Sequence, residues 1–153
     1  MQELNETQRA VQRSFRDFVD QRVLPQARNI DREQRFPMDL FREVAALGFF
    51  GMRYPEDAGG SGMDNISYAL AVMELARGSL SLAATCTMQS LMGTHFLHRY
   101  GDDEMVERFF RPALRGEKIC AIYMTKPNDG SDLMAITTHA RKTEQFFVKK
   151  KKK

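Results

Sequence analysis

A loop that follows a short apolar run holds the side chains of this sequence best suited to ligand chemistry. The run Ile119–Met124 leads into Thr125–Asp132, a turn-rich stretch that contains Gly130 and Ser131. Backbone N–H groups around such a Gly-Ser pair can cradle a phosphate, and the Thr125 hydroxyl and N–H could bond the edge of a flat ligand. On composition alone, an ordinary turn shaped by proline and glycine is favoured over a ligand site.

Histidines and methionines offer two further kinds of site. His95 and His98 lie three residues apart in a helical pattern, as a metal or acid–base pair would. No carboxylate or cysteine at helical spacing completes a metal shell, so packing or surface histidines are favoured. Several of the 10 methionines share this segment, where they could line a tunnel for an apolar chain or fill the core. The sequence contains no nucleophile elbow, GxxxxGK loop or Rossmann glycine motif, and no general base can be assigned.

The composition is that of a globular chain. The 153 residues are 42% hydrophobic, which excludes a disordered or collagen-like chain. No stretch approaches the ~20 apolar residues of a membrane span, and the first residues lack the apolar core of a signal peptide, so a cytoplasmic protein is expected. Cys86 and Cys120 have apolar neighbours and no CxxC spacing, which favours buried reduced thiols over a disulfide or metal pair.

The net charge of +3 comes from the five consecutive lysines at 149–153. Removing them leaves 18 basic residues against 20 acidic ones, a net charge of −2 for residues 1–148. A basic run can bind nucleic acid through phosphate charge. Neither an aromatic platform nor a basic helix face accompanies this one, so we expect no nucleic-acid partner.

The elements that must position these groups are helical as far as about Gly116. Apolar residues recur at three- and four-residue spacing in five segments, 5–23, 37–47, 65–77, 80–100 and 103–111. Asn5, Asp64, Ser79 and Asp102 are the expected N-caps, with Gln8 completing a capping box at the first. The segment 80–100 is apolar on more than one face, which predicts a central buried helix.

Prolines and glycines mark where these helices should change. Pro25 is expected to kink or end the first helix near Val23, unless its neighbours absorb the lost hydrogen bond, and Pro112 to close the last helix early. Pro37 should start the second helix. Three glycines within 59–62 indicate unusual backbone angles or the close approach of another surface.

At Lys118 the pattern changes to β. Ile119–Met124 predicts a buried strand, and Ile136–Ala140 and Phe146–Val148 predict two more. We therefore expect a helical domain over residues 1–117, the start of an incomplete β domain over 118–148, and a lysine tail at 149–153.

Short motifs spread over residues 3–148 match one protein family in order and spacing. They are Phe18-Val19-Asp20, Leu24-Pro25, Ile30 to Glu33, Phe36-Pro37, Leu47-Gly48, Tyr54-Pro55-Glu56, Gly59 to Asp64, Glu74 to Arg77, Gly116 to Lys118 and Thr125 to Asp132. Together they resemble the N-terminal part of the flavin-dependent acyl-CoA dehydrogenases. The resemblance implies a mainly α fold, in which the family's helical N-terminal domain is followed by the first strands of an incomplete middle β domain.

The resemblance also implies chemistry. Members of the family oxidise the α,β bond of an acyl-CoA thioester and pass a hydride to FAD, while a glutamate takes the α-proton. The residues that correspond to its cofactor-binding segment are Ile122, Met124, Thr125, Gly130 and Ser131. Those expected to contact acyl-CoA are Ser131, Met88, Leu91 and Met92.

Two substitutions and the length depart from the family pattern. Lys126 stands where the family usually has glutamate, and Asp129 where it has a small residue. The general base, the remaining flavin strands and the C-terminal four-helix domain are not encoded, so we expect an N-terminal fragment, truncated, frameshifted or completed by a second chain, that is inactive alone. Homo-oligomerisation and an electron-transfer flavoprotein partner are expected from the resemblance. The alternative is a helical interaction module, or degenerate fragment, that no longer binds flavin.

Overall fold

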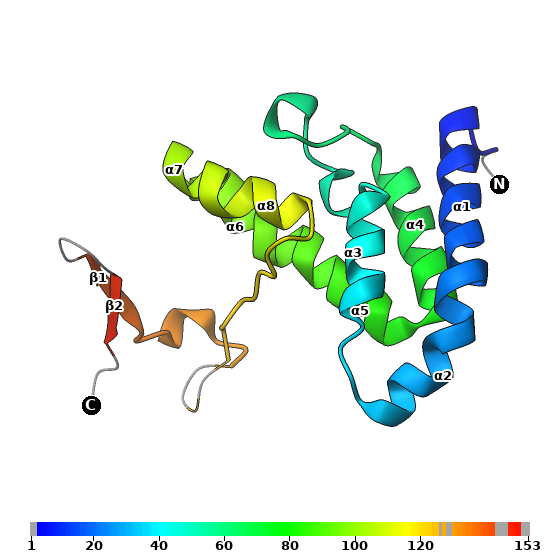
Figure 1. Ribbon diagram of the computed structural model, residues 1–153. Coiled ribbons are helices and arrows are strands. Elements are labelled where there is room, and N and C mark those ends of the chain that lie inside the picture. The colour runs from blue at the N-terminus through cyan, green and yellow to red at the C-terminus, as the bar shows by residue number, and fades with distance from the viewer. Residues whose placement is uncertain (1–2, 126, 128–129, 143–146, 151–153) are drawn as a thin grey trace. The chain divides into compact units, whose positions relative to one another are not determined.

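A computed structural model of the chain describes residues 3–125, 127, 130–142 and 147–150. The chain divides into two compact units, Met1–Ala121 and Ile122–Lys153, which are described separately. The α-helices of the first unit are α1 (Glu6–Phe18), α2 (Leu24–Glu33), α3 (Met38–Ala46), α4 (Asn65–Gly78), α5 (Leu80–Met88), α6 (Thr94–Tyr100), α7 (Asp103–Met105) and α8 (Arg111–Leu114). Helix α1 packs along α4, and α3 and α4 both contact α5 (Figure 1).

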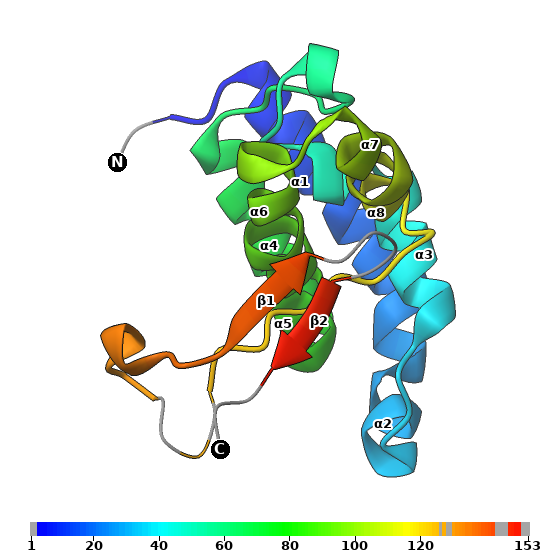
Figure 2. The ribbon, with the colours of Figure 1, turned by 90° about the vertical axis from the view of Figure 1, so that its left-hand side faces the viewer.

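Single π-helical turns connect several of these helices without a break. They are η1 (Val19–Val23) between α1 and α2, η4 (Gln89–Gly93) between α5 and α6, and η5 (Val106–Phe110) between α7 and α8. Two 3-10 turns, η2 (Phe49–Gly51) and η3 (Glu56–Ala58), lie in the connection from α3 to α4. Helices α5 and α6 therefore follow one another through η4, as Figures 1 and 2 show.

The predicted N-caps are confirmed. At α1 the Asn5 side chain accepts from the Gln8 N–H at 2.8 Å, and the Asn5 N–H donates to the Gln8 side chain at 3.1 Å. The side chains of Asp64, Ser79 and Asp102 each accept the N–H three residues on, at α4, α5 and α7. These caps satisfy N–H groups that have no partner within a helix, which is why the side chain just outside the helix marks its start.

Pro112 and Pro25 both lie at the start of a helix. Pro112 was predicted to close a helix, and the prediction is wrong, because Pro112 lies in the first turn of α8, which continues to Leu114. Pro25 likewise lies in the first turn of α2. Each follows a π turn, so the helix changes its hydrogen-bond pattern just before the residue that lacks an N–H.

The core of the first unit is a cluster of aromatic and aliphatic side chains. Phe41 and Phe49 are fully buried, and Phe50 is 1% exposed. The rings of Phe41 and Phe50 lie 4.7 Å apart, and the Phe49 ring stacks on Tyr68 at 5.1 Å. Aromatic pairs at these separations stabilise a core beyond the area they bury.

The segment predicted as a central buried helix is helical but only partly buried. Leu82, Ala83 and Cys86 belong to the core of the unit. Leu80 is 74% exposed and Phe96 is 52% exposed. An apolar composition on several faces thus overstated the burial, because the helices that pack against α5 leave part of its surface uncovered.

The second unit holds a 3-10 turn, η6 (Leu133–Ala135), and an antiparallel hairpin of β1 (His139–Lys142) and β2 (Phe147–Lys150). His139 pairs with Lys150 and Lys142 pairs with Phe147. Both strands start later than predicted, and Phe146 lies outside the described residues. The first lysines of the expected tail, at 149 and 150, belong to β2. The strand predicted over Ile119–Met124 is wrong, because these residues form no ladder.

Candidate functional site

The predicted cofactor residues lie in the second unit, on chain that is neither helix nor strand. Ile122 is half-buried, Met124 is 38% exposed, and Thr125 is exposed. Gly130 and Ser131 form an exposed bend, and a methyl group built on Gly130 would meet nothing within 4 Å. The described residues here offer exposed hydroxyls and a glycine with free space around it, groups that can bond a ring edge or a phosphate. Lys126 and Asp129, the departures from the family pattern, lie outside the described residues.

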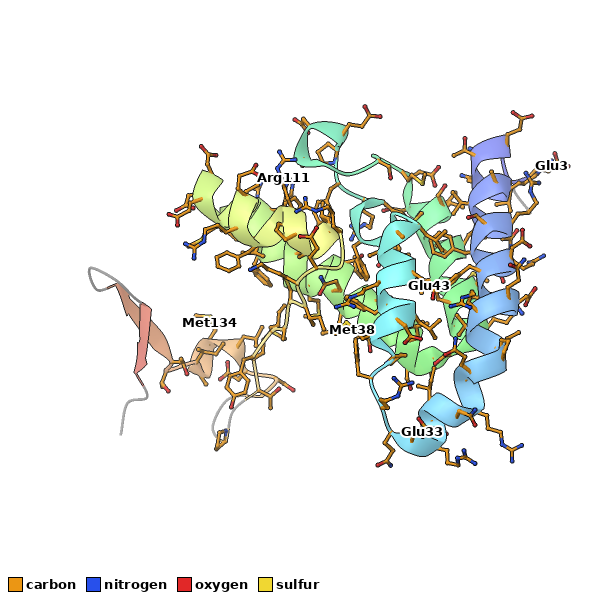
Figure 3. All side chains as sticks on the ribbon, in the orientation of Figure 1. Glu3, Glu33, Met38, Glu43, Arg111 and Met134 are labelled. Atoms are coloured by element: carbon orange, nitrogen blue, oxygen red, sulfur yellow. The ribbon has the colours of Figure 1, made fainter. Side chains whose placement is uncertain are left out.

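The interpretation of this loop as an ordinary turn is also supported, by the contacts of Asp132 at its end. The Asp132 side chain accepts the Met134 N–H at 3.0 Å and caps η6. The Met134 side chain itself is 94% exposed (Figure 3). A loop can close on an aspartate and still present its earlier residues to a ligand, so the two interpretations are compatible.

Of the four predicted acyl-contact residues, Ser131 lies in the second unit, and the other three lie together in the first unit where α5 passes into η4. Met88 is the last residue of α5 and is 47% exposed. Leu91 and Met92 belong to η4, where both are partly buried and Leu91 packs against the core. Residues three and four apart on a helix share a face, so this sequence spacing places the three side chains at one location in the first unit.

A buried polar network supports η4, and sequence reasoning missed it. The Tyr54 hydroxyl lies 2.8 Å from Thr94 Oγ1 and donates to the Ser90 carbonyl at 3.1 Å. The Tyr68 hydroxyl lies 2.8 Å from Ser90 Oγ. Burial raises the pKa of both tyrosines, so they keep their protons at neutral pH. Polar groups inserted into a helix perturb its regular ladder, and the sequence signal was the trio of polar residues Gln89, Ser90 and Thr94 within an apolar segment.

The glycine-rich loop places Tyr54 in this network. The Gly62 N–H donates to the Tyr54 carbonyl at 2.8 Å, and Gly59 and Gly62 have φ of +89° and +56°. A methyl group on Gly60 would overlap the Tyr54 carbonyl oxygen. Arg111 of α8 donates to the Asp57 carbonyl at 3.3 Å from the other side (Figure 3). Both expectations for these glycines, unusual angles and close approach, are confirmed.

The chain that leaves the first unit is bonded to Gln89, a contact that sequence reasoning also missed. The side chain of Gln89 is buried and bonds the backbone at Ala113, Lys118 and Cys120. It therefore joins η4 to the residues just before the predicted cofactor segment.

The side chain of His98 has a packing role. The His98 ring stacks on Phe110 at 5.3 Å and meets Tyr54 edge-on at 4.9 Å. Among the described residues, no group of three His, Cys, Asp or Glu side chains could hold a metal ion. Both cysteines are free thiols, and burial raises the pKa of Cys86 to about 12. Within the described part of the chain, no helix combines the length and apolar character needed to cross a membrane.

Comparison with known proteins identifies a family. The family model described as acyl-CoA dehydrogenase, N-terminal domain, matches residues 5–117. Benzylmalonyl-CoA dehydrogenase of Aromatoleum aromaticum is 53% identical over 146 residues, which cover 95% of this chain and 39% of that protein. The 3-(aryl)acrylate reductase of Clostridium sporogenes is 35% identical over 139 residues, which cover 90% and 37%.

Solved structures show the same fold. A glutaryl-coenzyme A dehydrogenase in complex with glutaryl-CoA matches with a TM-score of 0.88 and 28% identity, over 97% of this chain and 38% of that one. Butyryl-CoA dehydrogenase from Megasphaera elsdenii matches with a TM-score of 0.82 and 28% identity, over 94% and 38%. The chain spans about two fifths of the length of these relatives. The mainly α fold class predicted from the sequence is confirmed, and the chain belongs to the acyl-CoA dehydrogenase family, whose N-terminal helical domain it carries.

Proposed function

We propose that this chain forms the N-terminal part of an FAD-dependent acyl-CoA dehydrogenase that oxidises the α,β bond of an acyl-CoA thioester. The observation that carries the proposal is the match over 95% of the chain to a dehydrogenase that is 53% identical. The described residues at 122–125, 127 and 130–131 support it, because none of them is buried and their polar groups are accessible to a flat ligand. The dehydrogenation itself needs a general base, and none of these residues supplies one, so we expect the chain to be inactive alone.

The residues of the second unit would hold the cofactor. FAD, when bound, supplies a ring that accepts the hydride. The Thr125 hydroxyl and N–H would bond the edge of that ring, with Met124 packing beside it. Gly130 would let the backbone approach the phosphates, because it carries no side chain, and the Ser131 hydroxyl would bond a phosphate oxygen or the acyl-CoA.

We further propose an acyl group that carries an aromatic ring. Methionine sulfur makes favourable contacts with aromatic rings and adapts to their shape, and Met88 and Met92 lie at the proposed acyl site. Two relatives have names that specify benzylmalonyl-CoA and 3-(aryl)acrylate. A homo-oligomer or a second chain would complete the enzyme, an electron-transfer flavoprotein would reoxidise it, and the cytoplasm is the proposed location.

Flavin absorbance tests the cofactor assignment. We expect the purified chain, alone or mixed with a completing polypeptide, to become yellow with FAD and to show an oxidised-flavin band. Thr125→Val and Ser131→Ala should each weaken FAD affinity about tenfold, as expected from ~1.4 kcal/mol for a lost hydrogen bond to a charged or polar ligand group. Thr85→Val is the matched control, because it also removes a hydroxyl, one that donates to the Ser81 carbonyl within α5 at 2.9 Å.

The outcomes separate two functions. Colourless protein under both conditions would reject flavin binding and favour the helical interaction module. Yellow protein whose affinity is unchanged by both variants would keep the flavin and reject Thr125 and Ser131 as its ligands. For the substrate, equal binding of phenylpropanoyl-CoA and butanoyl-CoA to the yellow protein would reject the aromatic preference.

A further inference from the structure

A single buried glutamine holds the chain where it leaves the first unit. Gln89 lies in η4 and is 1% exposed. Its Nε2 donates to the Ala113 carbonyl at 3.0 Å and to the Lys118 carbonyl at 2.8 Å. Its Oε1 accepts the Cys120 N–H at 2.8 Å. Both N–H protons of the amide therefore donate to backbone carbonyls, and its oxygen accepts one backbone N–H.

The pattern of these bonds is that of a β ladder. In a parallel sheet, one residue donates to the carbonyl of residue i−1 and accepts from the N–H of residue i+1 on the neighbouring strand. Lys118 and Cys120 flank Ile119, and the Gln89 amide bonds the carbonyl of the first and the N–H of the second. The side-chain amide thus takes the place of the backbone N–H and C=O of one residue on a neighbouring strand. The strand-like residues Ile119–Met124 therefore have a hydrogen-bonding partner at their start, although they enter no ladder.

A close approach at Gly93 supports the same conclusion independently. A methyl group built on Gly93 would overlap the Cys120 Cβ and lie 3.3 Å from its Cα. The segment Lys118–Cys120, where the chain leaves the first unit, is called the exit chain. It is therefore packed against η4 one turn beyond Gln89. Any larger residue at 93 would push Cys120 away from the glutamine.

The base of this contact is rigid. Thr94 Oγ1 donates to the Gln89 carbonyl at 2.9 Å, a hydrogen bond that spans the π turn η4. The Tyr54 hydroxyl bonds the Ser90 carbonyl next to it. Gln89 is consequently held on both its backbone and its side chain.

We propose that Gln89 is a positioning residue that fixes the exit chain at Lys118–Cys120 and thereby sets the affinity of the segment beginning at Ile122 for FAD. The inference rests on the proposed function, because it gives the buried amide a role in cofactor binding. The physical basis is entropy: a ligand-binding segment that starts from a fixed point loses less conformational freedom when the ligand binds.

The two thiols of the chain provide the test. Gln89→Met retains the size of the side chain and removes all three hydrogen bonds. We expect the labelling rate of Cys120 by a thiol reagent to rise at least tenfold, while Cys86, buried in the core, labels as slowly as before. Thr85→Val, one turn earlier on the same helix, should change neither rate. Rapid labelling of both cysteines would mean general unfolding, and an unchanged Cys120 rate would overturn the role of Gln89.

FAD affinity, measured on the same proteins, tests the second part of the proposal, the effect of Gln89 on cofactor binding. We expect Gln89→Met to bind FAD at least tenfold more weakly than the unaltered chain, and Gly93→Ala to have the same direction of effect with Gln89 intact. Faster Cys120 labelling with unchanged FAD affinity would overturn the inference and leave the proposed function standing. If the unaltered chain binds no FAD, alone or completed, the proposed function fails and takes the cofactor role of Gln89 with it, while the labelling ratio still reports whether Gln89 holds the exit chain.

Discussion

The two units of this chain differ in what their side chains bury. In the first, the Phe41 and Phe49 rings are fully enclosed and polar groups as deep as Gln89 find backbone partners. In the second, no described side chain from Ile122 to Thr138 is buried, and the sheet has two strands in the described part of the chain. An isolated hairpin is marginally stable at best.

This difference places the buried core in the first unit, whereas the residues that we propose to bind FAD lie in the second. The first unit has the core, the helix caps and the ion pairs that stabilise a helical domain. In the second, the described side chains from Ile122 to Thr138 bury little apolar surface that could offset the conformational entropy of folding. Substitutions in the first unit should therefore change the free energy of unfolding, and matched substitutions in the second should not.

The largest expected effect on the free energy of unfolding comes from removing an aromatic ring from the core. Phe49→Ala removes a fully buried side chain that contacts three other rings. We expect a loss of ~3–5 kcal/mol in the free energy of unfolding, measured with urea and circular dichroism. Met134→Ala, at a side chain that is 94% exposed, should stay within ~0.5 kcal/mol. A comparable loss for both would show that the second unit has a core of its own.

The next effect concerns a carboxylate that joins α1 to α4. Glu74 is 5% exposed in its side chain and accepts from Arg16 Nη2 at 2.7 Å and Arg77 Nε at 2.9 Å. Because both arginines are half-exposed, Glu74→Gln should destabilise the unit by about 2 kcal/mol, less than a fully buried pair would lose. Glu107→Gln, in a pair whose carboxylate is 66% exposed, should change stability by less than ~1 kcal/mol.

The Glu74 effect should depend on pH. Burial acts to raise the pKa of Glu74, but the hydrogen bonds from Arg16 and Arg77 outweigh it and leave the pKa lowered. A lowered folded-state pKa gives stability that is fully present above the unfolded-state value of about 4.3 and is lost as the pH falls through the folded-state pKa. The gap in stability between the unaltered chain and Glu74→Gln should therefore shrink below about pH 4. A gap that is constant down to the acid transition would contradict this assignment.

What the sequence could predict depends on how far apart the interacting residues are. The caps at Asn5 and Asp64 were predicted because cap and helix are neighbours in the chain. Met88, Leu91 and Met92 were proposed as acyl contacts from the family resemblance, and their position where α5 passes into η4 follows from their spacing on one helical segment. By contrast, Tyr54 meets Thr94 across 40 residues and Gln89 meets Cys120 across 31, so no local pattern shows either contact.

Two wrong predictions, the strand at Ile119–Met124 and the helix end at Pro112, failed for reasons that residue preferences do not show. Ile119–Met124 has the composition of a strand, but a side-chain amide occupies the place of its first neighbour. Pro112 should end a regular helix, but the preceding π turn shifts the hydrogen-bond pattern before the proline is reached. In both places a non-local contact or an irregular turn outweighs the local preference, which is where propensity arguments fail.

The smallest expected effect tests whether the buried polar network around η4 contributes to stability or only fixes the geometry of the turn. Tyr54→Phe keeps the ring against Phe110 but removes the hydroxyl that serves Thr94 and the Ser90 carbonyl. We expect a loss of about 1 kcal/mol by urea unfolding, the usual net value of a buried hydrogen bond. Tyr100→Phe is the control, because that side chain is 75% exposed and its loss should be within ~0.5 kcal/mol. If Tyr54→Phe also speeds Cys120 labelling, the buried polar network around η4 holds the exit chain through Gln89. If stability falls while the labelling rate stays the same, the network stabilises η4 but does not hold the exit chain.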